Sequence, residues 1–303
     1  IDELIASAMA QGMPAIALTD LSNVFGMVKF YRAAVAAGIK PVVGADVWLE
    51  NPTDRNKPYR LVLLCQDLGG YRNLSRLLTR AYAEGQHAGR PCLAKEWLHG
   101  SASHGLIALS GAQEGDIAQA LLSGNAALAE SLAEDYRRLF PERFYLELQR
   151  TGQPLQEEVN HGAVALAGRL GLPVVATNHV HFLKAEDFEA HEVRVCIQDG
   201  RVLADTRRPR RYTPQQYFRS TQEMAALFED IPEALENTRE IARRCNLRLT
   251  FGINYLPDFP LPAGLSVDEV LRTQSAAGLK ERLLLLPDDR REALRPAYEA
   301  RLQ

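Results

Sequence analysis

Two histidines at alternate positions, His179 and His181, are the side chains of this sequence best suited to metal chemistry. They follow the apolar run 173–177, whose pattern predicts a buried strand. Residues i and i+2 of a strand point to the same face, so both imidazoles are expected side by side at the strand end. Neighbouring imidazoles can bind a transition metal such as zinc. Taken singly, each histidine is better explained as a polar residue that ends a strand.

Two aspartates extend the same pattern to other predicted strands. Asp20 closes the apolar run 15–19, and Asp46 lies within the apolar segment 42–49. In α/β folds the working residues gather at the carboxyl ends of the strands. Several strands of this chain therefore end on side chains that are compatible with a metal.

The elements that must position these residues alternate along the chain. Strands are predicted over residues 15–19, 42–49, 59–65, 106–109, 144–148 and 173–177. Helices are predicted over residues 1–11, 24–37, 71–82, 116–122, 126–139, 154–170, 223–228, 232–244, 267–286 and 288–303. Six strands mostly separated by helices indicate a parallel sheet or barrel. Three prolines between residues 257 and 262 indicate a linker before the last two helices.

Bulk properties exclude several classes of protein. The 303 residues are 46% hydrophobic and 24% charged, which suits one large α/β domain or two smaller ones. The net charge of −3 means that any contact with nucleic acid must be local. No apolar run approaches the ~20 residues of a membrane span. The four cysteines form no C-x-x-C pair, so they are predicted to be small buried hydrophobes in a reducing cytoplasm: Cys65, Cys92, Cys196 and Cys245.

Other candidate groups have simpler explanations. Acidic residues are favoured at a helix start without any chemistry, and an exposed basic turn is more often solvated than bound to phosphate. A single histidine on a helix is usually a packing residue, and for His191 only proximity to His181 would change this interpretation. No serine has the motif of a nucleophile. The groups concerned are Glu114 and Asp116, the turn of Arg207, Arg208, Arg210 and Arg211 with Tyr212, and Ser110 and Ser220.

The order of motifs along nearly the whole chain resembles one known family. The segments include Met13-Pro-Ala-Ile-Ala-Leu-Thr-Asp-Leu-Ser-Asn23, Gly38-Ile-Lys-Pro-Val-Val-Gly-Ala-Asp46, Ala190-His-Glu-Val-Arg-Val-Cys-Ile197 and Asp230-Ile-Pro-Glu-Ala-Leu-Glu-Asn237. They are similar to the N-terminal polymerase and histidinol phosphatase (PHP) domain of bacterial replicative DNA polymerase III alpha subunits, which are C-family polymerases.

The resemblance implies a fold and a division of the chain. It implies an α/β fold, a distorted seven-stranded, TIM-like PHP barrel over residues 1–255. The resemblance also places the first strand, which normally carries an H-x-H motif, upstream of residue 1. The chain opens without a methionine, so its natural start is expected to be missing. A Pro-rich linker is expected over residues 256–265, and residues 266–303 are expected to be the helical start of the polymerase region. The magnesium-binding carboxylates of the polymerase would lie beyond residue 303.

The family's metal site carries over only in part. Asp20 matches the aspartate of a T-D-H motif, whose histidine is Leu21 here, and Asp46 stands where a glutamate ligand is expected. His181 matches the histidine of an N-D-x-H motif, whose aspartate is replaced by His179. Arg60 stands at a histidine ligand's position, and a guanidinium has no lone pair to donate and repels a cation. The resemblance therefore implies a vestigial site with no catalytic residue and no metal. Any residual metal would use Asp20, Asp46, His179 and His181.

Three functions remain open at this point. The first is the PHP portion of a replicative polymerase, acting as a scaffold and as a docking site for the proofreading exonuclease subunit. This portion would need no cofactor, while the full-length cytoplasmic protein would use Mg²⁺ and contact DNA and other replicase subunits, but no membrane. The second is an active metal-dependent phosphoesterase or 3′–5′ exonuclease in the barrel. The third is the similar domain of an error-prone C-family polymerase. In each case the five polar site positions are expected in one cleft, with Arg60 paired to Asp20 or Asp46.

Overall fold

The computed structural model describes residues 1–254 and 256–302, which form two compact units, Ile1–Leu249 and Thr250–Gln303. The predicted domain boundary at residue 255 and the predicted helix end at residue 303 fall outside the described residues. Within the described parts, no helix combines the length and the apolar character needed to cross a membrane.

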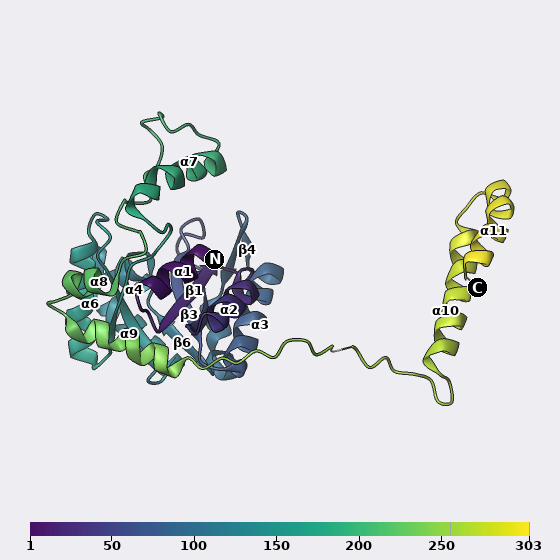
Figure 1. The fold of residues 1–303 in the computed structure, drawn as a ribbon, viewed down its shortest axis with the longest axis horizontal. Coiled ribbons are helices and arrows are strands. Elements are labelled where there is room, and N and C mark those ends of the chain that lie inside the picture. The colour runs from purple at the N-terminus through teal and green to yellow at the C-terminus, as the bar shows by residue number, and fades with distance from the viewer. Residues whose placement is uncertain (255, 303) are drawn as a thin grey trace. The chain divides into compact units, whose positions relative to one another are not determined.

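The first unit is built on one sheet of eight strands (Figure 1). The strands pair in the order β4-β5-β2-β3-β6-β7-β8, and β1 pairs with β2 beside this path. Their bounds are β1 Ala15–Leu21, β2 Lys40–Leu49, β3 Tyr59–Cys65, β4 Gln86–His87, β5 Arg90–Leu93, β6 Leu106–Leu109, β7 Phe144–Gln149 and β8 Val174–Thr177. All six predicted strands are confirmed, whereas the short hairpin of β4 and β5 was not predicted.

The α/β class and the barrel-like sheet are confirmed, but the expectation of parallel strands throughout is wrong for β3. This strand runs antiparallel to both of its neighbours, β2 and β6. Residues 50–58, which join β2 to β3, are too few for the crossover that parallel strands require. The start of β3 therefore lies beside the carboxyl end of β2, so residues from both strands reach the same edge of the sheet.

Helices surround the sheet, and α7 with the loop that follows it projects from the body of the first unit (Figure 1). The α-helices of this unit are α1 Asp2–Ala10, α2 Met27–Ala36, α3 Leu68–Glu84, α4 Asp116–Leu122, α5 Ala126–Leu139, α6 Gln156–Leu170, α7 Phe188–Asp199, α8 Thr221–Leu227 and α9 Pro232–Arg244. The short 3-10 segments are η1 Lys95–Leu98, η2 Gly100–Ser103, η3 Ala112–Glu114 and η4 Ala185–Asp187.

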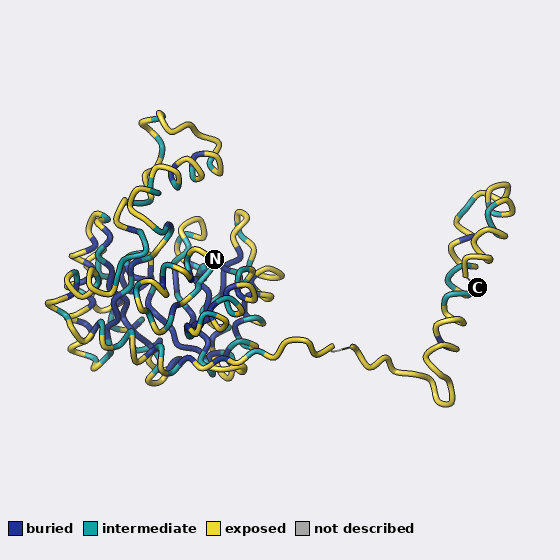
Figure 2. The backbone as a smooth tube through the Cα atoms, in the orientation of Figure 1, coloured by how far each residue is buried: buried dark blue, intermediate teal, exposed yellow. Residues whose placement is uncertain are grey.

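Most strand residues of the first unit are buried, as the dark blue stretches of the tube show (Figure 2). Alternate strand residues such as Val42, Leu64 and Ile107 pack with Ile241 and Cys245 near the end of α9. The strand residues that alternate with these point to the opposite face and belong to the larger core, which includes side chains of α3, α4, α5 and α6. The four cysteines are free and buried, which confirms the prediction made for them.

Lys40, the first residue of β2, ties the sheet to α9. Its Nζ donates hydrogen bonds to the carbonyl of Ala242 at 2.6 Å and to Oδ1 of Asn246 at 2.9 Å. A cation is favourable at a helix carboxyl end, where carbonyl groups lack intrahelical partners. The backbone N–H of Asn246 also donates to the carbonyl of Gln66, the residue after β3. The last helix of the first unit is thus fastened to segments some two hundred residues earlier in the chain.

The second unit consists of an extended segment and two helices. Among its described residues up to position 265 there is no helix or strand. Helix α10, Val267–Leu284, begins with a capping box in which Ser266 and Glu269 bond each other's backbone N–H groups. Helix α11, Asp288–Leu302, follows it and contains Pro296.

Candidate functional site

A bidentate ion pair between Arg60 and Asp46 occupies the edge of the sheet where β2 ends and β3 begins. Arg60 donates from Nε to Oδ1 of Asp46 at 2.7 Å and from Nη2 to Oδ2, and both side chains are buried. The register pairs Trp48 with Arg60 and Asp46 with Val62, so Arg60 and Asp46 are diagonal neighbours on one face. The predicted pairing of Arg60 is confirmed with Asp46.

Arg60 also contacts an aromatic ring and a second carboxylate. Its guanidinium lies 4.7 Å from the centroid of the Trp48 ring, and Nη1 lies 3.6 Å from Oε2 of Glu114. Burial opposes the charged form, but the hydrogen bonds and the charge of Asp46 outweigh it, with help from Glu114 and Glu147, and raise the pKa of Arg60. The guanidinium is therefore a fixed positive charge within the cleft.

Glu147 of β7 adds a second buried carboxyl to the same side of the sheet. It accepts hydrogen bonds from Thr177 Oγ1 at 2.5 Å and from Gln149 Nε2 at 3.1 Å, while its Oε2 has no partner in the described residues. Burial raises the pKa of Glu147, and the nearby charge of Asp46 adds to the rise. Burial therefore favours the neutral acid, which differs from a metal ligand in having a proton on one oxygen.

Asp20 does not join this group. Its Oδ2 accepts a hydrogen bond from the backbone N–H of Gly26 at 3.2 Å, just before α2. The β1–β2 register pairs Leu21 with Asp46 and Asp20 with Ala45, so Leu21 shares the face of Asp46 and Asp20 lies on the other face. In the described chain no ion pair links Asp20 to Arg60. The expected convergence is thus wrong for Asp20.

Three histidines and a tyrosine form a cluster of rings beside the end of β8. The ring centroids of His179 and His181 lie 4.5 Å apart, as predicted, and His181 lies 5.4 Å from His191 on α7. Tyr212 completes the cluster at 4.6 Å from His181 and 4.7 Å from His191. The strand itself ends at Thr177, and His179 has a left-handed backbone with φ of 43°. An irregular segment with one left-handed residue, rather than strand alternation, brings the first two rings together.

The histidine cluster is neutral and poorly supplied with hydrogen bonds. Burial and the charge of Arg60 lower the pKa of His179 to about 4. Burial, the other two histidines and Arg60 lower the pKa of His181 to about 3. Among the described residues, Nε2 of His181 and both ring nitrogens of His191 are buried without a partner. His191, whose proximity to His181 sequence patterns alone did not reveal, therefore belongs to the site.

These residues do not fit the metal centre that the barrel family implies. Both oxygens of Asp46 are taken by Arg60, Leu21 has no donor atom, and Asp20 lies on the other face. Within the described residues, no group of three or more His, Cys, Asp or Glu side chains is placed to hold an ion. A cation there would also be repelled by Arg60.

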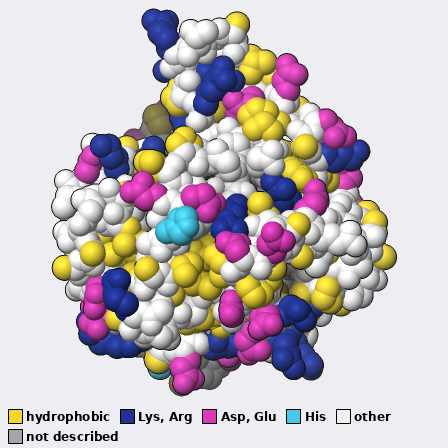
Figure 3. Space-filling view, turned by 90° about the vertical axis from the view of Figure 1, so that its left-hand side faces the viewer, with side chains coloured by type: hydrophobic (Ala, Val, Ile, Leu, Met, Phe, Trp, Pro, Cys, Tyr) yellow, Lys and Arg dark blue, Asp and Glu magenta, His cyan; other side chains and the backbone are white. Residues whose placement is uncertain are grey.

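The remaining candidate groups have structural roles. Asp116 accepts hydrogen bonds from Tyr136 Oη and from the N–H of Ile117, both at 2.9 Å, at the start of α4. Ser110 Oγ accepts from the N–H of Glu147, and Ser220 caps α8. In the basic turn, Arg208 pairs with buried Glu192 and Arg211 with Asp199, which fastens the turn to α7. Figure 3 shows charges of both signs interspersed over one face, without a continuous basic track.

Comparisons with known proteins point to one family. Residues 1–151 match the model of the PHP domain. The chain is 50% identical over its full length to DNA polymerase III subunit alpha of Pseudomonas fluorescens, 52% identical over 99% of its length to that of Pseudomonas aeruginosa, and 47% identical over 99% to that of Escherichia coli K12. It spans only about a quarter of these relatives, 26%, 25% and 26% of their lengths.

Two solved structures are more distant. A metal-dependent phosphoesterase from Bifidobacterium adolescentis matches with 11% identity and a TM-score of 0.38, over 58% of this chain and 80% of that one. An amidohydrolase from Chromobacterium violaceum matches with 16% identity and a TM-score of 0.40, over the same shares. Scores this low do not bear on the function of the site.

Proposed function

Because this chain belongs to the PHP-domain family, we propose that it is the PHP region of a replicative DNA polymerase III alpha subunit, acting as a scaffold rather than a hydrolase. The identity of about half of all residues to alpha subunits over the whole chain supports the assignment to a polymerase. DNA-templated synthesis itself, with Mg²⁺ as its metal, belongs to the longer protein of which such a region is part.

One observation carries the proposed loss of hydrolysis. Arg60 donates from two guanidinium nitrogens to the two oxygens of Asp46. The positive charge of the arginine thus replaces the charge that a bound metal ion would place beside this carboxylate. A buried carboxylate needs such a partner, since an unpaired buried charge is costly. The pair therefore neutralises the negative charge of Asp46, while neither Asp46 nor Arg60 remains available as a metal ligand.

Metal content and hydrolysis test this assignment together. After dialysis against zinc or manganese, the chain is expected to retain far less than one metal ion per molecule by mass spectrometry. With manganese it is expected to hydrolyse neither a phosphomonoester nor the 3′ end of a labelled oligonucleotide above background. Manganese-dependent hydrolysis that is lost in His181→Ala but kept in His161→Ala, which alters a histidine outside the cluster, would mean that the barrel is an active phosphoesterase.

The proposed docking role concerns a separate proofreading exonuclease subunit. If the barrel no longer hydrolyses DNA, editing must be supplied by another protein, and a rigid domain with an intact core is a suitable platform for it. Calorimetric titration of the purified exonuclease subunit into this chain is expected to show binding that a chelator does not change. Loss of binding on chelation would reveal a metal-dependent cleft, and absence of binding by the folded chain would leave only the scaffold role.

A further inference from the structure

Helix α7 turns charged side chains inward and aliphatic side chains outward. Glu192 is 3% exposed and pairs with Arg208 of the loop that follows the helix. On the outer side, Val193 is 41% and Ile197 is 75% exposed. Single exposed aliphatic residues are common on protein surfaces, but several on one helix that also buries a charge mark an interaction surface. The outer side of α7 therefore has the character of an interface.

The outer residues are spaced to meet another helix. Ala190, Val193 and Ile197 are exposed and are separated by three and four positions, so they form one stripe along α7, which we call the outer stripe. Stripes with this spacing pack against each other where two helices meet. Val202, in the loop after the helix, adds a further exposed aliphatic side chain.

The outer stripe belongs to a segment that projects from the first unit and is nevertheless fastened to it (Figure 1). The ring of His191 lies 5.4 Å from that of His181 and 5.5 Å from that of Phe182. On the same side, Arg208 pairs with Glu192. A surface that is fixed before its partner arrives loses less conformational entropy on binding.

The segment 188–212, which contains α7 and its loop, carries six arginines and four carboxylates, a net charge of +2. Four of these arginines pair with carboxylates of the same segment. In the described part of the chain, Arg194 and Arg210 have no carboxylate partner. A second copy of the chain is disfavoured as the occupant, because it would bring two segments of like charge together. A helix with carboxylates beside its apolar stripe is complementary.

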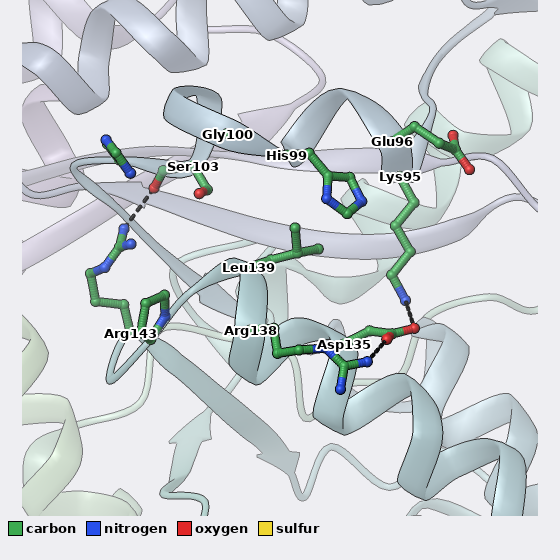
Figure 4. Close-up of a pocket in the computed structure, with 11 residues that line it drawn as sticks. Lys95, Glu96, His99, Gly100, Ser103, Asp135, Arg138, Leu139 and Arg143 are labelled. Atoms are coloured by element: carbon green, nitrogen blue, oxygen red, sulfur yellow. Dashed lines mark hydrogen bonds and ion pairs between the residues drawn. The ribbon is translucent and has the colours of Figure 1, made fainter.

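The cations of another hollow are already balanced within the chain. A recess of about 480 Å³ lies between η1, η2 and the carboxyl end of α5, at the amino-terminal ends of β6 and β7 (Figure 4). There Lys95 lies 3.6 Å from Asp116 and 4.0 Å from Asp135, and Arg138 also pairs with Asp135. The unpaired Arg194 beside the outer stripe is different, since its counter-charge must come from elsewhere.

We propose that the outer stripe of α7 packs against a helix in the part of the longer protein that lies outside this chain, with carboxylates of that helix facing Arg194. The inference rests on the proposed assignment to a polymerase alpha subunit. The chain spans only about a quarter of the alpha subunits it resembles, 26% and 25% of their lengths. A helix on the same polypeptide meets α7 at a high effective concentration, so a modest stripe suffices to hold it. The scaffold role would thus act through this surface.

Hydrogen exchange of α7, measured by mass spectrometry in this chain and in the complete protein, tests the proposal. The amides of α7 are expected to exchange about tenfold or more slowly in the complete protein, because packing suppresses local opening. Ile197→Ser in the complete protein is expected to remove most of this protection, and Arg194→Glu part of it. Val35→Ser is the matched control, since Val35 is a β-branched residue of α2 with 53% exposure. It is expected to leave the exchange of α7 unchanged.

Equal exchange of α7 in the two proteins, or full protection in Ile197→Ser, would overturn the proposal. A dimer of this chain that Ile197→Ser dissociates in analytical ultracentrifugation would also overturn it, because the occupant would then be a second copy. Primer extension tests the polymerase assignment separately. A complete protein that extends a primer but leaves α7 unprotected would refute the packing and retain the assignment. Equal urea unfolding of the unaltered chain and of its Ile197→Ser variant verifies that the exposed substitution leaves the core intact.

Discussion

Two cations at opposite ends of the sheet, Arg60 and Lys95, show how differently a buried positive charge can be accommodated. Arg60 donates two N–H groups to the carboxylate of Asp46 and stacks on Trp48. Lys95 has carboxylates only at 3.6 and 4.0 Å and an ammonium without an acceptor. The first cation is held by two hydrogen bonds to one carboxylate, and the second by two more distant carboxylates and the face of Tyr136.

Removing Arg60 should produce the largest effect, because Asp46 would be left buried without its partner. Arg60→Ala is expected to lower the free energy of unfolding by roughly 3–5 kcal/mol in urea titrations at pH 7. The double variant Asp46→Leu, Arg60→Met is expected to recover most of this loss, since apolar residues of similar volume often replace a buried ion pair without cost. A single-variant loss below about 1 kcal/mol would show that the pair is not needed for the fold.

The histidine cluster should give the next largest effect, through acid sensitivity. The pKa values of His179 and His181 are lowered to about 4 and about 3, whereas an unfolded histidine titrates near 6.5. Between these values the unfolded state binds more protons, so the free energy of unfolding falls as the pH falls from about 6.5 towards 4. Each such histidine contributes a slope of up to about 1.4 kcal/mol per pH unit.

The measurement is the slope of unfolding free energy against pH in that window. His181→Asn is expected to remove about one proton's worth of slope relative to the unaltered chain. The raised pKa of buried Glu147 acts in the opposite direction, because its protonation favours the folded state as the pH falls. The comparison between His181→Asn and the unaltered chain is independent of that contribution, because both contain Glu147. An unchanged slope in His181→Asn would show that this ring titrates normally.

At the other end of the sheet the same kind of removal should cost less. Lys95→Met keeps the packing on Tyr136 and leaves Asp116 with its hydrogen bonds from Tyr136 and Ile117. The expected loss in unfolding free energy is about 1 kcal/mol, well below that of Arg60→Ala. A loss as large as that of Arg60→Ala would mean that Lys95 is a structural ion-pair residue, and the comparison drawn here would fail.

The smallest effect is expected at the rim of the cleft. Glu114 lies 3.6 Å from Arg60, but its side chain is 56% exposed. Exposed ion pairs contribute little, so Glu114→Gln is expected to change the free energy of unfolding by no more than about 0.5 kcal/mol. A larger change in urea titrations would mean that Arg60 depends on two carboxylates rather than on Asp46 alone.

Part of this site could be predicted from the sequence, and the positions of the other residues could not, for physical reasons. Asp46 and Arg60 could be placed together, because the resemblance to the family barrel brings their positions into one cleft. Asp20 could not, because one residue of strand register decides its face, and the apolar run 15–19 does not fix that register.

Two other features depend on tertiary packing alone. His191 lies near the start of α7, and its contact with His181 depends on where the irregular segment after Thr177 places that helix, which no periodicity encodes. Lys95 lies in a single 3-10 turn without a motif, and its unused donors become apparent only once its neighbours are in place.

The bonds from Lys40 to Ala242 and Asn246 have a consequence for the order in which the protein can form. Chains are synthesised from the amino terminus at about 5–20 residues per second, and contacts between distant residues are slow to close. The strand that begins at Lys40 leaves the ribosome some two hundred residues before its partner helix. Until then the sheet face formed by Val42, Leu64 and Ile107 lacks the cover of Ile241 and Cys245, so this nascent domain has a defined interval in which a chaperone could bind it.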